Sequence, residues 1–543
     1  MHFYIVLVYY INSMGIRHFS SVLSAELEGV DARLIEVETD IRAGLHAFTI
    51  VGLGDKALSE SKERINSALK NMDIKPPEKE NRKVIINLAP ADIKKTGSQY
   101  DLSIALGYLL ASEQIKPFNT KAILFAGELS LDGTLRPISG ALNIARLAQK
   151  AKIPYLALPA ANAIEAAIIP GIIVVPVLTL SQLIDHLEER TLIDPQPTTN
   201  VIKPPESPFL CIADIKGQAN AKRALMIAAA GGHNLLMVGP PGTGKTMLAQ
   251  AITSILPAPA LEEIIEVTGI YSSAGLLKED SYIGYRPFRA PHQTASPVAV
   301  VGGGTNPRPG EISLAHRGVL FLDELPEFRR DLLEALRQPL ESGKAVVNRI
   351  KNNLTFPARF MLVAAMNPCP CGYFGDSEKN CRCSEFEVRR YQKKVSGPLL
   401  DRIDIQITVP RLSIQQLRTE HVSKDTDDVK ARVLGARNRQ HARFAKKSRG
   451  KKILTNSELN SKDVDELITL TKEASAHINA VFDKSLISAR GYYRILKVAQ
   501  TIADLEDQDE VGITAINEAF SYRLREDDHQ QHLGKRPLSA LGR

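Results

Sequence analysis

Gly239-Pro240-Pro241-Gly242-Thr243-Gly244-Lys245-Thr246 is the stretch that decides the fold of this chain. An apolar run at 234–238 precedes it and predicts a buried parallel strand, and residues 247–255 after it predict a helix. A glycine-rich loop in that context lets backbone N–H groups surround phosphates at the positive end of a helix. Lys245 is expected to reach the β- and γ-phosphates, and the Thr246 hydroxyl to hold Mg²⁺. The sequence therefore predicts a nucleoside triphosphate site.

Composition sets broad limits on the rest of the chain. The 543 residues are enough for about three domains, and 44% apolar with 24% charged residues is ordinary for a globular protein. Five cysteines are too few for a disulfide framework and favour a reducing, cytoplasmic compartment. The apolar run at 3–11 is too short to span a membrane, so no membrane partner is expected. We interpret residues 1–13 as an extension upstream of a translation start at Met14.

The pattern along the chain predicts two α/β regions and a helical one. Strands are expected at 33–39, Ala47–Val51, 83–88 and 122–129, and helices at 59–71, 102–112 and Ala141–Ala151. The proline-rich stretch 191–208 has too few apolar residues to form a core, so we interpret it as a linker between domains. The predicted boundaries are 14–190 for an N-terminal α+β domain, 191–208 for the linker, 209–411 for the nucleotide domain, 412–525 for a helical lid, and 526–543 for a polar tail.

Several polar residues that could take part in ATP hydrolysis follow the phosphate loop along the chain. A second apolar strand ends in Asp323, which can share the Mg²⁺ shell with Thr246, and in Glu324, which can polarise the attacking water. A third strand ends in Asn367, which could orient that water. Arg402 and Arg490 come later, and an arginine on a transferring phosphoryl group can be worth roughly 10³ to 10⁵ in rate.

This order resembles the AAA+ ATPases, and further blocks resemble one family within them, the magnesium-chelatase-like ComM/YifB family. The blocks are Arg286-Pro-Phe-Arg-Ala-Pro-His292, Gly302-Gly-Gly304, Pro309-Gly-Glu-Ile-Ser-Leu-Ala-His316 and Asn367-Pro-Cys-Pro-Cys-Gly372. The resemblance implies an αβα ATPase core with a helical lid, using ATP and Mg²⁺. It also implies a homo-hexameric ring, with Arg402 as a finger on the neighbouring subunit's nucleotide and Arg490 as a lid sensor.

For function, the resemblance implies a motor that translocates on single-stranded or branched DNA and promotes branch migration or strand separation, as in natural transformation. The alternative is a magnesium-chelatase-like ATPase that remodels a protein partner. The N-terminal domain resembles the Lon-protease type, but Gln99 stands at the serine position and Leu142–Asn143 at the lysine position. Ser98 is one residue away and no lysine pairs with it, so we expect a catalytically inactive, structural or DNA-contacting domain.

Two insertions in the nucleotide domain favour nucleic acid as a binding partner. The segment 266–310 interleaves aromatic residues with cations, among them Tyr271, Arg286 and Arg289, a combination that suits base stacking and phosphate contact. The alternative is that these aromatics pack a small local core and the cations are solvated.

The second insertion, residues 344–356, predicts a hairpin whose tip carries Arg349 and Lys351, expected to point into the pore of a ring. A basic stretch at 430–452 is either a solvated helix face or a surface that follows phosphates.

Two Cys-x-Cys pairs, Cys369/Cys371 and Cys381/Cys383, are separated by nine residues. Four thiolates this close in sequence suit a tetrahedral Zn²⁺ site, although Cys-x-x-Cys is the more usual spacing. The alternative is four reduced cysteines on a loop.

Overall fold

The computed structural model describes residues 18–52, 56–79, 82–201, 210–277, 282–304, 307–347, 353–376, 378–413, 425–447, 453–484 and 488–523. They form two compact units. The first holds the described residues of 1–203, 260–284 and 349–356, and the second holds those of 204–259, 285–348 and 357–543. The predicted extension 1–13, the tail 526–543 and residues 202–208 of the linker lie outside the described residues.

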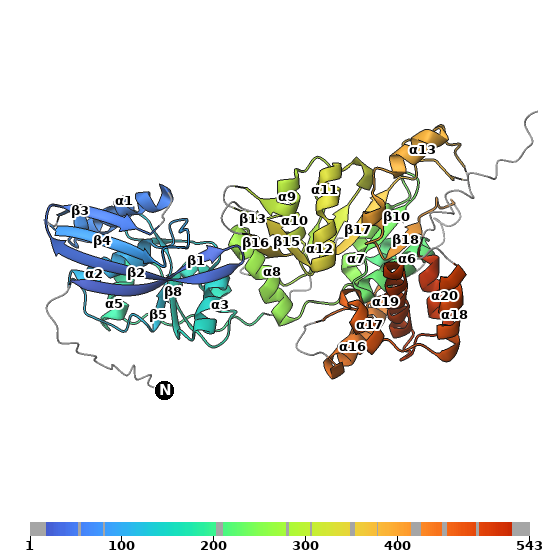
Figure 1. The fold of residues 1–543 in the computed structure, drawn as a ribbon. Coiled ribbons are helices and arrows are strands. Elements are labelled where there is room, and N and C mark those ends of the chain that lie inside the picture. Colours follow the sequence, from blue (N-terminus) through green and yellow to red (C-terminus); the bar gives the residue numbers. More distant parts are fainter. Residues whose placement is uncertain are drawn as a thin grey trace, which may run out of the picture. The chain divides into compact units, whose positions relative to one another are not determined.

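A seven-stranded mixed sheet is the frame of the first unit (Figure 1). Its order is β3 (Ala47–Val51), β4 (Arg82–Ala89), β2 (Asp31–Ala43), β1 (Phe19–Glu28), β5 (Ile123–Phe125), β8 (Tyr155–Pro159) and β9 (Ile173–Val177). The pairs β1–β2 and β2–β4 are antiparallel, and the other neighbours are parallel. A small ribbon pairs β6 (Glu128–Leu129) with β7 (Leu135–Arg136).

The strand predicted at 122–129 is wrong in its length. It is divided between β5 and β6, because Gly127 bonds to the start of the preceding helix, α2 (Asp101–Ala111), instead of continuing the ladder. Its N–H donates to Gln99 O (2.9 Å), and its carbonyl accepts from Leu102 N (3.1 Å). The other predicted elements of this region are present within a few residues.

The helices of this unit are α1 (Lys56–Asn71), α2 (Asp101–Ala111), α3 (Ala141–Ala151), α4 (Ala163–Ala166), α5 (Leu180–Leu187) and α8 (Leu261–Ala274). Helix α8 comes from the segment that we predicted as an insertion of the nucleotide domain, yet it packs with the N-terminal unit. Gly140 N, at the start of α3, donates to Ser272 O (3.0 Å), and Ile265 packs on the apolar cluster beneath α3. The segment 260–284 thus leaves the predicted 209–411 core.

The second unit is built on a five-stranded parallel sheet. Its order is β11 (Phe288–Arg289), β14 (Val319–Leu322), β17 (Met361–Met366), β10 (Leu235–Val238) and β18 (Ile405–Thr408). The phosphate-loop strand β10 lies between two neighbours, so loops at its carboxyl end meet those of β17 and β18. This α/β arrangement, with a parallel core sheet, confirms the predicted fold class.

The helices of this unit are α6 (Ala219–Gly231), α7 (Lys245–Ile255), α9 (Pro297–Val301), α10 (Glu311–Leu314), α11 (Arg330–Ala335), α12 (Arg337–Ser342), α13 (Glu385–Gln392) and α14 (Gly397–Leu400), followed by α16 (Asp425–Lys447), α17 (Ser461–Leu467), α18 (Lys472–Lys484), α19 (Ala489–Leu505) and α20 (Ile513–Ser521). Short strands are β12 (Gly302–Gly303), β13 (Arg308–Pro309), β15 (Lys344–Val347) and β16 (Leu354–Pro357), whose last residue alone belongs to this unit.

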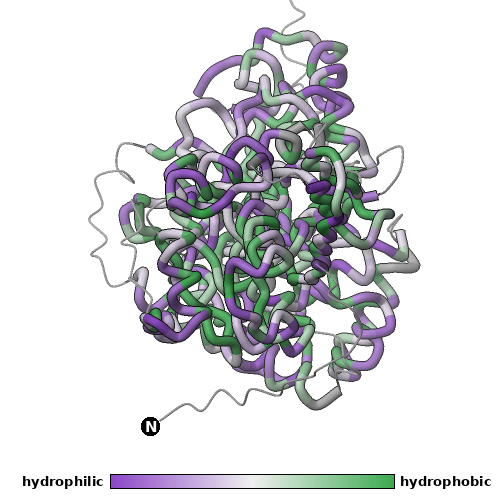
Figure 2. Tube along the Cα trace, turned by 90° about the vertical axis from the view of Figure 1, so that its left-hand side faces the viewer, coloured by the Kyte–Doolittle hydropathy of each residue, from purple (hydrophilic) through white to green (hydrophobic). Residues whose placement is uncertain are grey.

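The lid helices have no separate core. Val433 of α16 and Ile502 of α19 belong to the same buried apolar cluster as Leu225 of α6 and Ile252 of α7. In Figure 2 green apolar and purple polar residues alternate along many of the outer segments, as amphipathic helices require. Within the described part of the chain, no helix combines the length and apolarity needed to cross a membrane.

Candidate functional site

The phosphate loop has the conformation that its glycines predict. Gly242 and Gly244 adopt φ of +79° and +85°, in the left-handed region that favours glycine. Gly239 is required for another reason, because a Cβ there would lie 2.2 Å from Val409 O of the adjacent segment. The loop therefore turns directly from the end of β10 into the first residue of α7, Lys245.

Lys245 is buried, and its ammonium group faces the loop. Nζ donates to Gly239 O (2.7 Å) and Pro240 O (2.9 Å), and it lies 3.3 Å from Asn367 Oδ1. Burial lowers the pKa of Lys245. Asn367 is there because β17 pairs with β10 in parallel register, Val238 opposite Met366, so the residues that follow each strand meet. A phosphate could replace the two carbonyl oxygens as the partner of this amine.

Thr246 and Asp323 provide the oxygen atoms expected of a magnesium site. Thr246 Oγ1 donates to Asp323 Oδ2 (2.8 Å), and Asp323 Oδ1 accepts from Glu324 N (2.9 Å). A hydroxyl and a carboxylate at this distance are hard ligands that fit Mg²⁺. The predicted pair therefore lies together, beside the phosphate loop.

Glu324 stands at the junction of two clefts. One of about 310 Å³ is lined by Thr246 and Asp323 among others, and the other, of about 450 Å³, by Asn367; Glu324 lines both. Its backbone is left-handed, with φ +51°, which is uncommon for glutamate and typical of functional positions. Glu324 therefore lies beside both the Thr246–Asp323 pair and Asn367.

Arg402 lies at the other edge of the sheet. It precedes β18, whose first residue pairs with the first residue of β10, and Asn234 Nδ2 donates to Arg402 O (2.9 Å). A four-residue strand spans about 13 Å, so the backbone of Arg402 lies at the opposite end of β10 from the phosphate loop of its own chain. Its guanidinium donates to Arg337 O (3.2 Å), Pro398 O (2.6 Å) and Glu341 Oε1 (2.6 Å).

Arg490 shares the Glu341 carboxylate with Arg402. Its Nη2 lies 4.0 Å from Glu341 Oε1, and its side chain is 69% exposed. The structure thus brings the two predicted arginines together around one acid that the sequence analysis did not single out.

Three of the five residues predicted to contact nucleic acid have structural partners instead. Tyr271 is buried in α8, so its ring cannot stack on a base. Arg286 donates to two backbone carbonyls, Pro257 O (2.6 Å) and Arg317 O (2.7 Å). Arg289 forms a two-pronged ion pair with Glu311 (2.6 and 2.7 Å). These contacts favour the alternative of local packing for this insertion.

The other two, Arg349 and Lys351, lie outside the described residues. Strands are present at both ends of the predicted hairpin, β15 and β16.

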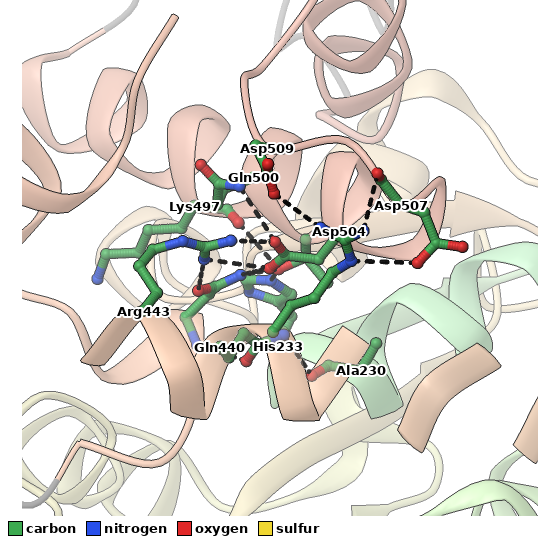
Figure 3. A network of polar contacts seen from close by, with 12 residues as sticks. Ala230, His233, Gln440, Arg443, Lys497, Gln500, Asp504, Asp507 and Asp509 are labelled. Carbon is green, nitrogen blue, oxygen red and sulfur yellow. Dashed lines mark hydrogen bonds and ion pairs between the residues drawn. The ribbon is translucent and has the colours of Figure 1, made fainter. Parts of the chain in front are cut away.

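Three arginines of the basic stretch, Arg432, Arg439 and Arg443, form ion pairs inside the lid. Arg443 of α16 reaches the fully buried carboxylate of Asp504 on α19, and Gln440 donates to Ala230 O (3.0 Å), as Figure 3 shows. Arg439 pairs with Asp507 (3.1 Å) and with Asp509 (2.8 Å). These arginines join α16 to α19 and to the turn after it, which favours a structural role for this part of the stretch. Residues 448–452 lie outside the described residues.

The four clustered cysteines meet at one point. Sulfur distances are 3.4 Å for Cys369–Cys371, 3.7 Å for Cys369–Cys381 and 3.6 Å for Cys371–Cys381, and all four thiol sulfurs, Cys383 included, lie within 4.8 Å of one another. A Zn–S bond of about 2.3 Å gives a tetrahedron edge of about 3.8 Å, so the donor set fits Zn²⁺.

The cysteine loop also touches the nucleotide site. Cys369 follows Asn367 by two residues, and Gly372 lies so close to the phosphate loop that a Cβ would be 2.7 Å from Pro241 Cδ. Gly372 has a left-handed φ of +86° as well.

In the first unit the residues at the predicted protease positions are engaged in structural contacts. Gln99 Nε2 donates to Glu26 (3.0 Å), and Ser98 Oγ to Glu128. Leu142 is buried, and Asn143 donates to Val30 O. The partner of Ser98 is an acid, not a lysine, which agrees with an inactive domain; the Lon-type fold itself remains a prediction.

Comparison with known proteins covers nearly the whole chain. Residues 211–417 match the family described as magnesium chelatase, subunit ChlI, residues 37–162 that of subunit ChlI of Mg-chelatase, and residues 423–523 that of the ChlI C-terminal region. The competence protein ComM of Haemophilus influenzae is 41% identical over 92% of this chain and 97% of its own length. YifB of Escherichia coli is 40% identical over 94% and 97%. The 38 kDa magnesium-chelatase subunit of Rhodobacter capsulatus is 28% identical over 30% of this chain and 51% of its own length.

Proposed function

The chain belongs to the magnesium-chelatase-like ComM/YifB family of AAA+ ATPases, and on that premise we propose that it is an ATP-driven motor on DNA. In this proposal a homo-hexameric ring translocates on single-stranded or branched DNA and promotes branch migration or strand separation. The observation that carries the ATPase part is the group formed by Lys245, Thr246, Asp323 and Asn367 at the carboxyl edge of the parallel sheet.

In this proposal each residue of this group, together with Glu324, has a role in ATP hydrolysis. ATP bound with Mg²⁺ supplies the phosphoryl group, and the metal neutralises charge on its oxygens. Lys245 exchanges its two carbonyl partners for phosphate oxygens, while Thr246 and Asp323 hold the metal. Glu324 polarises the attacking water, and the Asn367 amide orients it.

The position of Arg402 supports a ring. A finger on the far edge of the sheet does not serve the nucleotide of its own chain, but a neighbouring subunit could present it. Such a head-to-tail interface generates a closed ring when the rotation closes. Arg490, on the same acid as Arg402, would reach the same neighbour.

DNA as the substrate is supported by a relative and by the predicted hairpin. The Haemophilus influenzae relative is called a competence protein, and Arg349 and Lys351 at the hairpin tip remain the predicted grip. The experiment is the ATPase rate without DNA and with single-stranded, duplex and branched DNA. A motor on DNA should be stimulated by at least one of them.

The second candidate is a remodelling ATPase for a protein partner, favoured by the matches to magnesium chelatase subunits. It predicts no DNA stimulation in that assay.

The proposal also includes one Zn²⁺ per chain on the four clustered cysteines. Its part is structural: four thiolates close the loop that joins Asn367 to α13 and hold Gly372 against Pro241.

A further inference from the structure

A groove runs beside α13, the helix that follows the cysteine cluster. Its volume is about 710 Å³. Its lining combines an exposed aromatic residue with five cations, namely Phe386, Arg330, Arg389, Arg390, Lys393 and Lys394. None of these residues had been singled out as a site from the sequence.

The charges of this groove are only partly balanced. Lys394 pairs with Glu327 (3.1 Å), and Arg389 with Glu385 one turn away on α13 (2.5 Å). Arg330, Arg390 and Lys393 are exposed, and none of their side chains has a hydrogen-bond or ion-pair partner among the described residues. The groove therefore offers at least three cations to an anionic partner.

Phe386 adds a stacking surface. This residue is 73% exposed on the first turn of α13, so its ring is accessible to a base. The turn that carries it is well fixed, since Ser384 and Glu387 bond reciprocally to each other's backbone N–H groups (3.3 and 2.8 Å). A rigid aromatic ring beside unpaired cations is the combination found in single-strand binding sites.

The groove continues towards the hydrolytic site. The cleft of about 450 Å³ that contains Glu324 and Asn367 shares three lining residues with it, Glu327, Arg390 and Lys394. A phosphate bound by Lys394 would compete with Glu327, three residues after the acid that polarises water. A ligand in the groove would thus change the contacts of Glu327, close to Glu324.

We propose that the α13 groove binds the phosphate backbone of single-stranded DNA, with a base stacked on Phe386, and that this contact stimulates hydrolysis. The inference rests on the proposed function, which it deepens by naming the surface that holds the substrate. An acidic surface of a neighbouring subunit is the competing occupant, and the aromatic ring favours the nucleic acid.

The test compares three variants with the wild-type protein. The groove variant combines Arg330→Gln, Arg389→Gln and Lys393→Gln, three groove cations that do not line the cleft of Glu324, and the stacking variant is Phe386→Ala. The control removes the same number of exposed cations that do not line the groove, by Lys121→Gln, Lys462→Gln and Lys472→Gln. The probe is fluorescein-labelled oligo-dT, titrated at several salt concentrations, with ATPase measured in parallel.

We expect the groove variant to flatten the slope of log K against log[salt] by about 2 units, because each contact on a single strand contributes roughly 0.7. The stacking variant should bind about tenfold more weakly, the effect of losing one stacked base. Basal ATPase should persist in both, DNA stimulation should fall in both, and the control should match the wild type.

Two results would overturn the inference alone: a groove variant with the binding and slope of the control, or one that fails to form the wild-type oligomer in native mass spectrometry, which would give the groove to a neighbouring subunit. If wild-type protein bound no DNA and showed no stimulation, the proposed function would fall as well.

Discussion

Replacing Arg402 with Ala is the sharpest test of the ring geometry, because the proposed ring requires this residue to act on the nucleotide of the neighbouring subunit. Two arms of its guanidinium rest on the backbone carbonyls of Arg337 and Pro398, and the third donates to Glu341. The Glu341 side chain is 46% exposed and water screens it, while the Arg402 side chain is 10% exposed, so this ion pair is worth about 1 kcal/mol. A phosphate could therefore replace Glu341 while the other two arms keep the group in place.

The expected rise in the activation barrier is much larger than the free energy of the Arg402–Glu341 ion pair. A finger arginine contributes roughly 10³ or more to turnover, or about 4 kcal/mol of barrier. Arg402→Ala should lower kcat by about that factor and leave the affinity for a fluorescent ATP analogue nearly unchanged. Glu341→Gln is the matched control, since it removes the same ion pair but keeps the arginine, and its turnover should stay near or above the wild-type value.

Mixing shows whether the residue acts across an interface. When Arg402→Ala is mixed equally with Lys245→Ala, about a quarter of the interfaces in a random ring combine an intact phosphate loop with an intact finger. Turnover should rise towards that fraction from two nearly inactive parents. The reasoning is refuted if Arg402→Ala and Glu341→Gln lose turnover equally, or if verified mixed rings recover none.

Three more predictions concern the nucleotide site, the cysteines and the lid. Lys245→Ala should abolish ATP binding, whereas Glu324→Gln should bind ATP and hydrolyse it at least 10²-fold more slowly; normal hydrolysis by the second would remove Glu324 from its role. Protein purified without chelators should carry about one zinc per chain, and Cys381→Ser with Cys383→Ser should lose the metal and weaken ATP binding; no zinc in the wild type would favour free thiols. Burial opposes ionisation of Asp404, but the nearby arginine and histidine outweigh it and lower its pKa, so its contribution to stability is present above an unfolded pKa of about 4 and is lost as pH falls. Asp404→Asn should therefore destabilise the protein by about 3–5 kcal/mol at pH 7. This difference should shrink progressively as the pH falls below about 4 towards the lowered folded pKa, and an equal loss of thermal stability at pH 7 and at about pH 3 would contradict this.

The parts of the site that the sequence predicted correctly are those that depend on local rules. Gly242 and Gly244 predict a loop with positive φ, and the apolar run before the loop predicts a buried strand. Asp323 and Asn367 could be placed beside Lys245 because the carboxyl ends of parallel strands meet at one edge. These inferences need only the backbone, and the structure agrees with them.

The predictions that failed concern side chains whose partners are distant in the sequence. We predicted that Arg289 would contact phosphate, but it pairs with Glu311, which lies 22 residues later in the sequence. Arg443 reaches Asp504, 61 residues away. No periodicity or composition signals such a pair. Conversely, the cations Arg390 and Lys394 were visible in the sequence, but not their place beside Glu324.

The sequence by itself therefore determined that this chain has a phosphate loop, an acid-ended strand and a parallel α/β core, because those features arise from contiguous residues and strand geometry. Only the tertiary structure decided that α8 packs with the N-terminal unit, that Arg402 and Arg490 share Glu341, and which cations remain available. The physical reason is that burial and ion pairing depend on the groups that surround a side chain in space, and packing brings those groups from remote parts of the chain.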